Sequence, residues 1–276
     1  MITDDTQRWI GGRDVRRPAG EPIRTSEYEV ASVATRAQVA AFVRDHHYAG
    51  EASSTAHHFE LYHRAELVGV ALFGPPASTN AHEKVWGDDL TQKQAVTLGR
   101  LVLLDEVPGN GESWFVAEAF RRLAARGIRA VESCADPEPR ADVHGNLTFR
   151  GHLGTIYQAL NARYVGKTND STLHLLPDGS CLSNRSQKKL RDGERGAQRP
   201  VLQLVQWGAT PLADGEDPYE WLVHWRSRIC RTMRHRGCHR YLWTLSRRDR
   251  RLLDRHAALA YPKLREAIGR WIVRPS

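Results

Sequence analysis

Cysteine is scarce in this sequence, and long apolar runs are missing. Four cysteines in 276 residues are too few for a disulfide scaffold, which favours a reducing compartment. No apolar run approaches the roughly 20 residues that a membrane helix needs. The chain begins with the polar, acidic segment MITDDTQRWI, which is not typical of a signal peptide. We therefore expect a cytoplasmic protein without a membrane helix.

Common catalytic and metal-binding motifs are missing as well. The sequence has no G-x-S-x-G elbow, no Walker loop and no HExxH zinc motif. Cys230, His235, Cys238 and His239 lie close together, but their spacing fits no standard zinc finger, so a structural zinc is the less favoured interpretation and we assign no metal ligands. Cys134 ends an apolar run, where a small core residue is a commoner role than a nucleophile.

Positive charge is concentrated in the C-terminal third. The formal net charge is +8, yet residues 183–276 carry 21 Lys and Arg against nine Asp and Glu, whereas residues 1–182 carry 19 against 23. This asymmetry favours a nucleic-acid partner, because Lys and Arg release condensed counterions from phosphates. Residues 226–255 contain 11 arginines interleaved with aromatic residues, a mixture that can hold phosphates and stack on bases. A solvated basic surface is the alternative.

These patterns predict three parts and a set of nucleic-acid contacts. We expect an N-terminal arm over 1–34, a catalytic domain over 35–177 and a basic C-terminal extension over 178–276. The residues expected to bind nucleic acid are Lys188, Lys189, Arg191, Arg231, Arg234, Arg236, Arg240, Arg247 and Arg248.

The stretch from residue 99 to residue 118 has the most informative pattern. Residues 101–104 are uniformly apolar, as in a strand buried on both faces. Pro-Gly-Asn-Gly at 108–111 then predicts a turn, and apolar residues at helical spacing follow over 115–123. A strand, a glycine turn and a helix direct backbone N–H groups and a helix N-terminus at an anion. An ordinary buried strand–helix unit is the alternative.

The remaining pattern predicts an α/β fold. Helices are expected over about 35–44, 152–161 and 218–229, strands over 58–64, 67–73, 97–104 and 128–134, closing strands over 163–167 and 171–176, and loops over 79–94 and 138–150. Arg100 interrupts an apolar strand, so it should face a partner or a ligand. Asp136 follows a buried strand, where sites of open α/β sheets collect.

This order of elements resembles the GNAT acyltransferase fold, a mixed central sheet flanked by helices. In that family the turn after the central strand cradles the pyrophosphate of coenzyme A, with the motif Gln/Arg-x-x-Gly-x-Gly/Ala. The segment beginning at Glu106 keeps the two glycines but has an acid in the first position. The resemblance implies that Gly109, Asn110, Gly111 and Glu112 bind the donor.

Five segments resemble the Mom family of phage DNA-modification proteins more closely. They read DHHYAG, LVGVALFGPPAS, LGRLVLLDEVPGNGESWFVAEAF, SCADP and GHLGTIYQALNARYVGKT, and lie within residues 35–167. The basic third resembles the C-terminal part of Mom-like proteins of actinobacterial phages. Members resemble GNAT enzymes in fold and convert adenine in DNA to N6-carbamoylmethyladenine, which blocks restriction. The resemblance implies a phage-encoded enzyme of the bacterial cytoplasm that acts on double-stranded DNA.

The resemblance places the family's functional positions on Arg100, Ser113, Asp136 and Tyr157. The adenine amine is a poor nucleophile and is paired in a duplex, so an enzyme must flip the base and offer the amine an acceptor. Asp136 is then the acceptor or general base, and Tyr157 protonates the leaving group. Ser113 would bind a carbonyl or phosphate oxygen, and Arg100 a carboxylate or phosphate.

Each of these residues also has a structural interpretation. An aspartate or serine can cap a helix, a tyrosine can lie in the core with a bonded hydroxyl, and an arginine can form a salt bridge. Secondary site candidates are Asp45, His47, Tyr48, Ser78 and His152.

The product that the resemblance implies limits which molecules can donate the group. The added group contains a two-carbon unit and an amide nitrogen, which a glycyl donor supplies and acetyl-coenzyme A alone does not. Glu106 would repel pyrophosphate, and Pro108 lacks an N–H donor. We therefore favour glycyl-tRNA as the donor, with acetyl-coenzyme A as the alternative. Two other functions stay open, an N-acyltransferase acting on a protein or small molecule and a non-catalytic nucleic-acid-binding protein.

Overall fold

The computed structural model describes residues 5–10, 13–18, 20–76 and 78–263. The chain forms two compact units. The first, here called the sheet unit, contains residues 1–137, 152–167 and 238–276. The second, the helical unit, contains residues 138–151 and 168–237.

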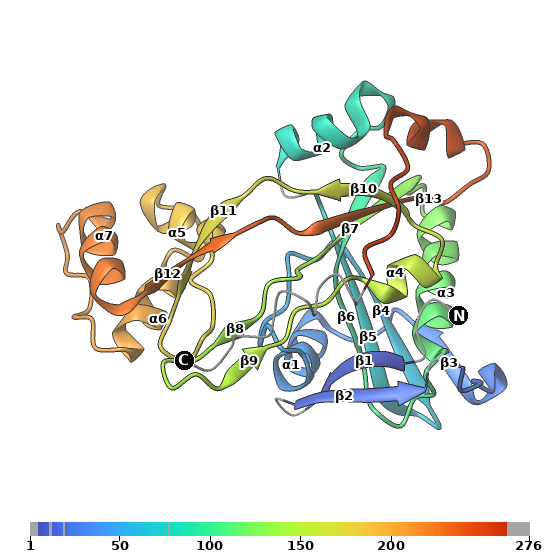
Figure 1. Ribbon diagram of the computed structural model, residues 1–276, viewed down its shortest axis with the longest axis horizontal. Coiled ribbons are helices and arrows are strands. Elements are labelled where there is room, and N and C mark those ends of the chain that lie inside the picture. The colour runs from blue at the N-terminus through green and yellow to red at the C-terminus, as the bar shows by residue number, and fades with distance from the viewer. Residues whose placement is uncertain (1–4, 11–12, 19, 77, 264–276) are drawn as a thin grey trace. The chain divides into compact units, whose positions relative to one another are not determined.

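The sheet unit is built on a seven-stranded mixed sheet with the order β10-β13-β7-β6-β5-β4-β3 (Figure 1). Its strands are β3 Tyr28–Ala31, β4 His57–His63, β5 Glu66–Gly74, β6 Ala95–Leu103, β7 Ala130–Ala135, β10 Arg163–Lys167 and β13 His239–Thr244. Strands β6 and β7 pair in parallel, and every other neighbouring pair of this sheet is antiparallel. A separate hairpin consists of β1 Asp5–Ile10 and β2 Arg13–Pro18. The predicted mixed central sheet is confirmed.

The position of β13 makes the two units differ from the parts that the sequence suggests. This strand belongs to the predicted C-terminal extension, yet it lies between β10 and β7 and pairs with both. The boundary expected at residue 177 therefore does not coincide with either unit, because the chain leaves the sheet unit after β10 and returns to it at residue 238.

The helices of the sheet unit are α1 Arg36–His46, α2 Thr79–Trp86, α3 Gly111–Ala125 and α4 Thr155–Ala159, with the 3-10 turns η1 Thr25–Glu27, η2 Gly87–Asp89 and η3 Arg250–Arg255. A capping box begins α1, because Thr35 Oγ1 accepts from the Gln38 backbone and the Gln38 side chain accepts from Thr35 N–H at 2.8 Å. The loop predicted over 79–94 is wrong for its first half. There Ser78 caps α2, whose buried face includes Trp86.

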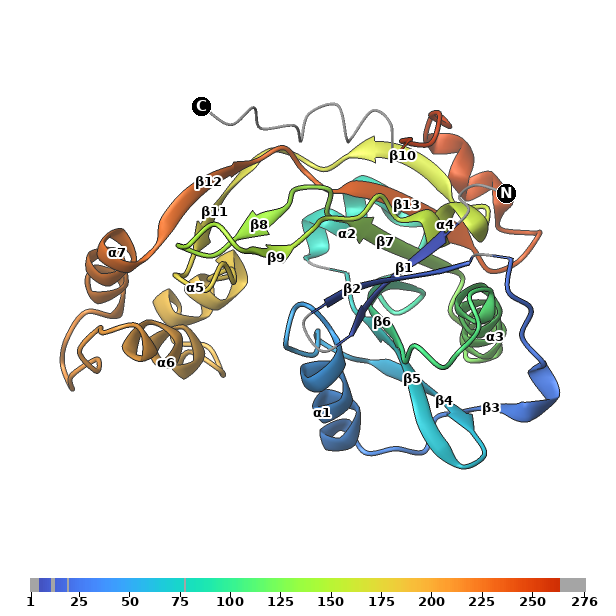
Figure 2. The ribbon, with the colours of Figure 1, turned by 60° about the horizontal axis from the view of Figure 1, so that its bottom comes forward.

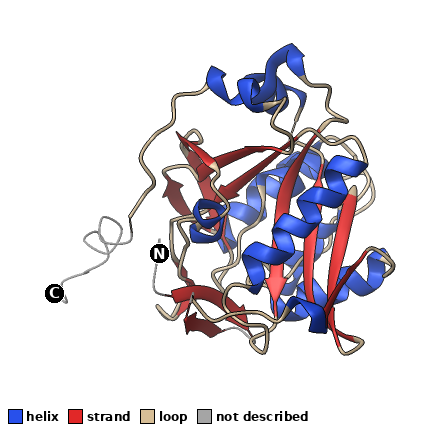
Figure 3. Cartoon of the chain, turned by 90° about the vertical axis from the view of Figure 1, so that its right-hand side faces the viewer, coloured by secondary structure: helices blue, strands red, loops and turns tan. Residues whose placement is uncertain are grey.

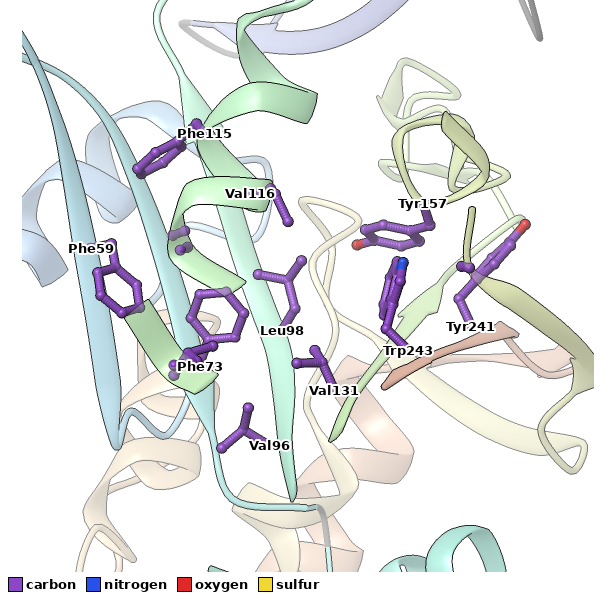
Figure 4. Packing of buried hydrophobic residues seen from close by; sticks show 14 of the residues in the cluster. Phe59, Phe73, Val96, Leu98, Phe115, Val116, Val131, Tyr157, Tyr241 and Trp243 are labelled. Atoms are coloured by element: carbon purple, nitrogen blue, oxygen red, sulfur yellow. The ribbon is translucent and has the colours of Figure 1, made fainter. Parts of the chain in front are cut away.

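Helices cover both faces of the sheet (Figures 2 and 3). Helix α1 packs Phe42 and Val43 on Val70 and Leu72 of β5. The opposite face carries the main core beneath α3 and α4, where Figure 4 shows the aromatic side chains of several strands gathered. This core includes Phe59, Phe73, Val96, Leu98, Phe115, Val116, Val131, Tyr157, Tyr241 and Trp243.

The helical unit has a small core of its own. Its elements are β8 Arg140–Ala141, β9 Leu147–Phe149, β11 Ser171–Leu175, α5 Asn184–Arg191, α6 Gln198–Gln206, α7 Pro218–Ile229 and β12 Arg231–His235. Leu182, Leu204 and Trp221 are buried together among α5, α6 and α7. The strand predicted over 171–176 forms, but it pairs with β12 and does not close the large sheet. In the described part of the chain, no helix is long and apolar enough to cross a membrane.

Candidate active site

Strands β6 and β7 separate part of the way along their length. Their register runs from Ala95–Ala130 to Thr97–Glu132 and then stops, although β6 continues to Leu103 and β7 to Ala135. One side chain crosses the opening, because Ser133 Oγ donates to the Leu98 carbonyl at 2.9 Å. Beyond this bond, the facing backbone groups of the two strands are released from pairing with each other.

A β-bulge in β6 positions Arg100 at this opening. Leu72 of β5 pairs with Arg100 and Phe73 pairs with Leu98, so Gly99 is the extra residue. Bulges redirect side chains and are common beside active sites. Glycine is needed here because a Cβ on Gly99 would lie 2.4 Å from Ser53 Oγ. The interruption that the sequence shows at Arg100 therefore coincides with a local distortion of the strand.

Arg100 is a half-buried charge without a carboxylate partner among the described residues. Its Nε donates to the Glu51 carbonyl at 2.9 Å, and Nη1 donates to the Gly99 carbonyl at 2.6 Å. These neutral acceptors fix the guanidinium but leave its charge uncompensated. Burial lowers the pKa of Arg100 from its ordinary value. A desolvated cation of this kind favours an anionic ligand or a developing oxyanion nearby.

Side chains from the turn after α1 and from the loop before α4 lie in the same region as Arg100. His47 and Tyr48 follow α1 with their ring centroids 4.1 Å apart, and Tyr48 lies 6.3 Å from the His152 ring. Burial, Arg100 and His152 together hold the pKa of His47 well below its ordinary value. Its Nδ1 accepts from the Ala49 N–H at 3.0 Å, so neutral His47 carries its proton on Nε2. His47 is therefore an N–H donor rather than a base.

Tyr157 reaches the same region from α4. Its ring centroid lies 6.4 Å from that of His152 and 5.6 Å from that of Trp243, against which it packs edge to face. Figure 4 shows its hydroxyl directed toward the β6 side. Burial raises the pKa of Tyr157, and the Ser133 side chain is its hydrogen-bond partner. Because desolvation outweighs the lowering by Ser133, the Tyr157 hydroxyl stays protonated at neutral pH.

Asp136 is half-buried directly after β7, as its place in the sequence suggests. Its backbone carbonyl accepts from the His152 N–H at 2.8 Å, which ties the end of β7 to the segment before α4. The structure thus brings Arg100, His47, Tyr48, His152 and Tyr157 to one region of the sheet unit, and the Asp136 backbone lies beside His152. Ser133 is a further member that sequence reasoning missed, and a lone polar residue in a buried strand was the available signal.

Among the described residues, three other candidates make polar contacts only with their neighbours in the sequence. Asp45 is exposed and pairs with Arg44 at 3.0 Å. Ser78 caps α2 by accepting from the Ala81 N–H. Ser113, in the first turn of α3, donates to the Asn110 carbonyl at 3.0 Å. Ser78 is therefore a helix cap, whereas the bond of Ser113 lies within the first turn of α3 and is not a cap, because a capping hydroxyl accepts from a backbone N–H.

The glycine turn forms as expected, but its polar groups already have partners. The N–H groups of Gly109 and Asn110 donate to the side chain and backbone of Glu21, at 3.1 and 3.3 Å. The Gly111 N–H donates to Pro108 O at 2.9 Å. Glu112 is buried and forms a salt bridge with Arg8 at 3.0 Å. The polar groups of the predicted donor-binding residues therefore already bind other parts of the chain.

The basic candidates differ in their surroundings. On α5, Arg191 pairs with Asp192 at 2.8 Å and Lys188 also pairs with Asp192, whereas Lys189 is half-buried. In β12, Arg234 pairs with Asp170 and Arg231 donates to a backbone carbonyl.

The candidate arginines of the sheet unit have no carboxylate partner among the described residues. Arg240 is half-buried opposite Cys134, which is exposed, so the core position expected for Cys134 is wrong. The pKa of the Cys134 thiol is raised to about 11, chiefly by desolvation. Cys134 is therefore a neutral thiol at neutral pH. Arg247 and Arg248 are exposed, as is Arg236 of the helical unit, and the structure gives none of these three an ion-pair partner among the described residues.

Comparison with known proteins places the chain in a family. Residues 27–263 match the Mom protein family, which covers most of the chain, so the protein belongs to the Mom family. No sequence among curated proteins matches significantly.

The solved structures that match the chain include acetyltransferases. Agmatine N-acetyltransferase matches at 12% identity over 79% of this chain and 99% of that one, with a TM-score of 0.37. N-acetylglutamate synthase from Neisseria gonorrhoeae, complexed with coenzyme A and N-acetyl-glutamate, matches at 11% over 80% of this chain and 35% of that one (TM-score 0.33). A Bacillus subtilis acetyltransferase in complex with CoA matches at 11% over 69% and 77% (TM-score 0.30). Identities this low concern the fold alone.

Proposed function

We propose that the protein transfers an acyl-type group to the N6 amine of adenine in double-stranded DNA. Membership of the Mom family over residues 27–263 carries this proposal. The grouping of Arg100, Tyr157 and Asp136 beside the opening of the sheet supports it, because acyl transfer needs a cationic group, a proton donor and a proton acceptor. The product we favour is N6-carbamoylmethyladenine, which would protect the DNA from restriction.

The donor that fits this product best is a glycyl ester, with glycyl-tRNA as the favoured form and acetyl-coenzyme A as the alternative. The flipped adenine N6 attacks the ester carbonyl carbon and forms a C–N bond. The C–O bond to the ribose then breaks, Tyr157 gives its proton to the leaving oxygen, and Asp136 takes the proton lost by N6. Arg100 stabilises the intermediate oxyanion. The N6-glycyl adduct and the carbamoylmethyl group contain the same atoms, so an isomerisation relates them.

The proposal predicts a modified nucleoside in DNA from bacteria that express the protein. Mass spectrometry of digested DNA should show an adenosine derivative heavier by one glycyl residue. In cells grown on isotope-labelled glycine, the modified base should contain both labelled carbons and the labelled nitrogen. If the donor is acetyl-coenzyme A, the modified base should be labelled by acetate and not by glycine.

Other outcomes favour other functions. An unaltered nucleoside profile with the protein expressed would contradict DNA modification. Acylated proteins or small molecules in the same cells would then favour an N-acyltransferase, and nucleic-acid binding without any product would favour a binding protein.

A cluster of exposed arginines in the sheet unit should provide much of the affinity for DNA. Arg247, Arg248, Arg250 and Arg251 are all exposed, and within the described residues no ion pair holds any of them. Changing all four to Gln should weaken duplex binding at every sequence and lower the salt slope by about 0.9 for each phosphate that the protein no longer neutralises. The measurement is fluorescence anisotropy at several salt concentrations.

The control is Lys188→Gln with Arg191→Gln on α5, where acids already neutralise both charges. We expect this pair to change the slope by less than the four arginines do. Equal slopes for the two variants and the wild type would contradict the assignment of the arginine cluster.

A further inference from the structure

An internal carboxylate occupies the glycine turn before α3. Glu21 Oε2 accepts from the Gly109 N–H at 3.1 Å, and the Glu21 backbone carbonyl accepts from the Asn110 N–H at 3.3 Å. Successive N–H groups at the start of a helix form an anion-binding site. Here the anion is part of the chain, supplied from a segment about 90 residues earlier in the sequence.

Glu21 is held in this position as an ionised group. Arg17 donates to both carboxylate oxygens at 2.7 Å and also pairs with Asp105 at 3.7 Å. The hydrogen bond from Arg17 and the one from Gly109 lower the pKa of Glu21. The acid predicted to repel phosphates, Glu106, is instead exposed. The negative charge at the turn therefore comes from the N-terminal arm.

A second side chain of the arm fills the interior of the turn. Arg8 of β1 is 5% exposed. It donates to the carbonyls of Leu104, Val107 and Pro108, the first at 2.8 Å and the last at 3.1 Å, and pairs with Glu112. The guanidinium thus ties the end of β6 to the start of α3 and satisfies the carbonyls of the turn.

We propose that Glu21 is a specificity-determining residue that closes this turn to diphosphate groups, while Arg8 holds the carbonyls of the turn in place. A pyrophosphate bound there would have to displace Glu21 from Gly109 and approach its charge. The donor of the proposed reaction is therefore a molecule that brings no diphosphate to the turn, such as an ester of a nucleic-acid ribose. This statement about the donor rests on the proposed function, whereas the closing of the turn does not.

Calorimetric titration of the full chain with inorganic pyrophosphate and with coenzyme A tests the inference without DNA. We expect no measurable binding at millimolar ligand for the wild type. Glu21→Gln removes the charge and keeps the shape, and should bind pyrophosphate at least about tenfold more tightly, because a like charge beside the ligand is removed. Glu21→Asp keeps the charge and should gain nothing. Glu29→Gln, at an exposed position of β3, is the control for net charge.

Two results would overturn the inference. The first is micromolar binding of either ligand by the wild type, and the second is equal affinity of the wild type and Glu21→Gln. Should Glu21→Gln fail to fold, as judged by circular dichroism, Arg17→Met releases Glu21 from its ion pair and should give a smaller gain, whose absence contradicts the proposal. None of these readouts depends on DNA modification, so the proposed function can fail or stand independently.

Discussion

Tyr157→Phe is expected to lower the rate of adenine modification by about 10²–10⁴-fold, the usual contribution of a general acid. The variant loses one oxygen, and the ring contacts with His152, Tyr241 and Trp243 are retained. Loss of the hydrogen bond between the hydroxyl and Ser133 costs about 1 kcal/mol of stability. Modified nucleosides counted by mass spectrometry against time give the rate.

A matched control separates proton transfer from loss of a hydroxyl elsewhere. Tyr62→Phe makes the same change in β4 of the same sheet, where the hydroxyl is half-buried and lies outside the candidate site. It should leave the rate within about twofold of the wild type. Equal rates for Tyr157→Phe and the wild type would show that Tyr157 is not the acid.

The rate of the wild type should also depend on pH in a defined way. Burial raises the pKa of Tyr157 above the ordinary value for tyrosine, which is about 10. The hydroxyl therefore keeps its proton through neutral and moderately alkaline pH, and no fall in rate from this residue is expected there. A fall in the wild-type rate at neutral or moderately alkaline pH that is absent in Tyr157→Phe would contradict this assignment.

The sequence predicted the elements whose local signals agree with their tertiary environment. The helix expected over about 35–44 forms as α1, and the apolar segment around Leu103 belongs to strand β6. Arg100 and Asp136 are polar groups in or directly after buried strands, and both lie beside the opening between β6 and β7. A charge inside an apolar run indicates a site because its burial is costly without a ligand or partner.

The parts that the sequence did not predict depend on contacts between distant segments. The short polar helix α2 is stabilised by burying Val85 and Trp86 against Leu242 of β13, more than 150 residues away. The strand order that inserts β13 between β10 and β7 has no local signature. The positions of Arg8 and Glu21 also have no local signature, because charged residues in a segment without a clear hydrophobic period look like those of any solvated arm.

Arg100→Met is expected to reduce the rate of adenine modification by about 10²–10³-fold, as the loss of one group that stabilises an oxyanion does. Methionine has a similar length and no charge, so the uncompensated cation disappears while most of the volume is kept. Arg100→Lys keeps the positive charge, but a lysine ammonium cannot reproduce the forked donation of the guanidinium to the carbonyls of Glu51 and Gly99. We therefore expect lysine to restore less than about tenfold of the lost rate.

Stability distinguishes a catalytic arginine from a structural one. Because Arg100 has no carboxylate partner among the described residues, Arg100→Met removes a desolvation cost together with two hydrogen bonds, and the two effects largely cancel. Arg163→Met is the control: this arginine donates to the carbonyls of Leu253 and His256 and pairs with Asp254. It should lower the melting temperature more than Arg100→Met does and leave the rate of the folded protein nearly unchanged. A large loss of stability in Arg100→Met with a normal rate per folded molecule would assign Arg100 to the fold instead of the chemistry.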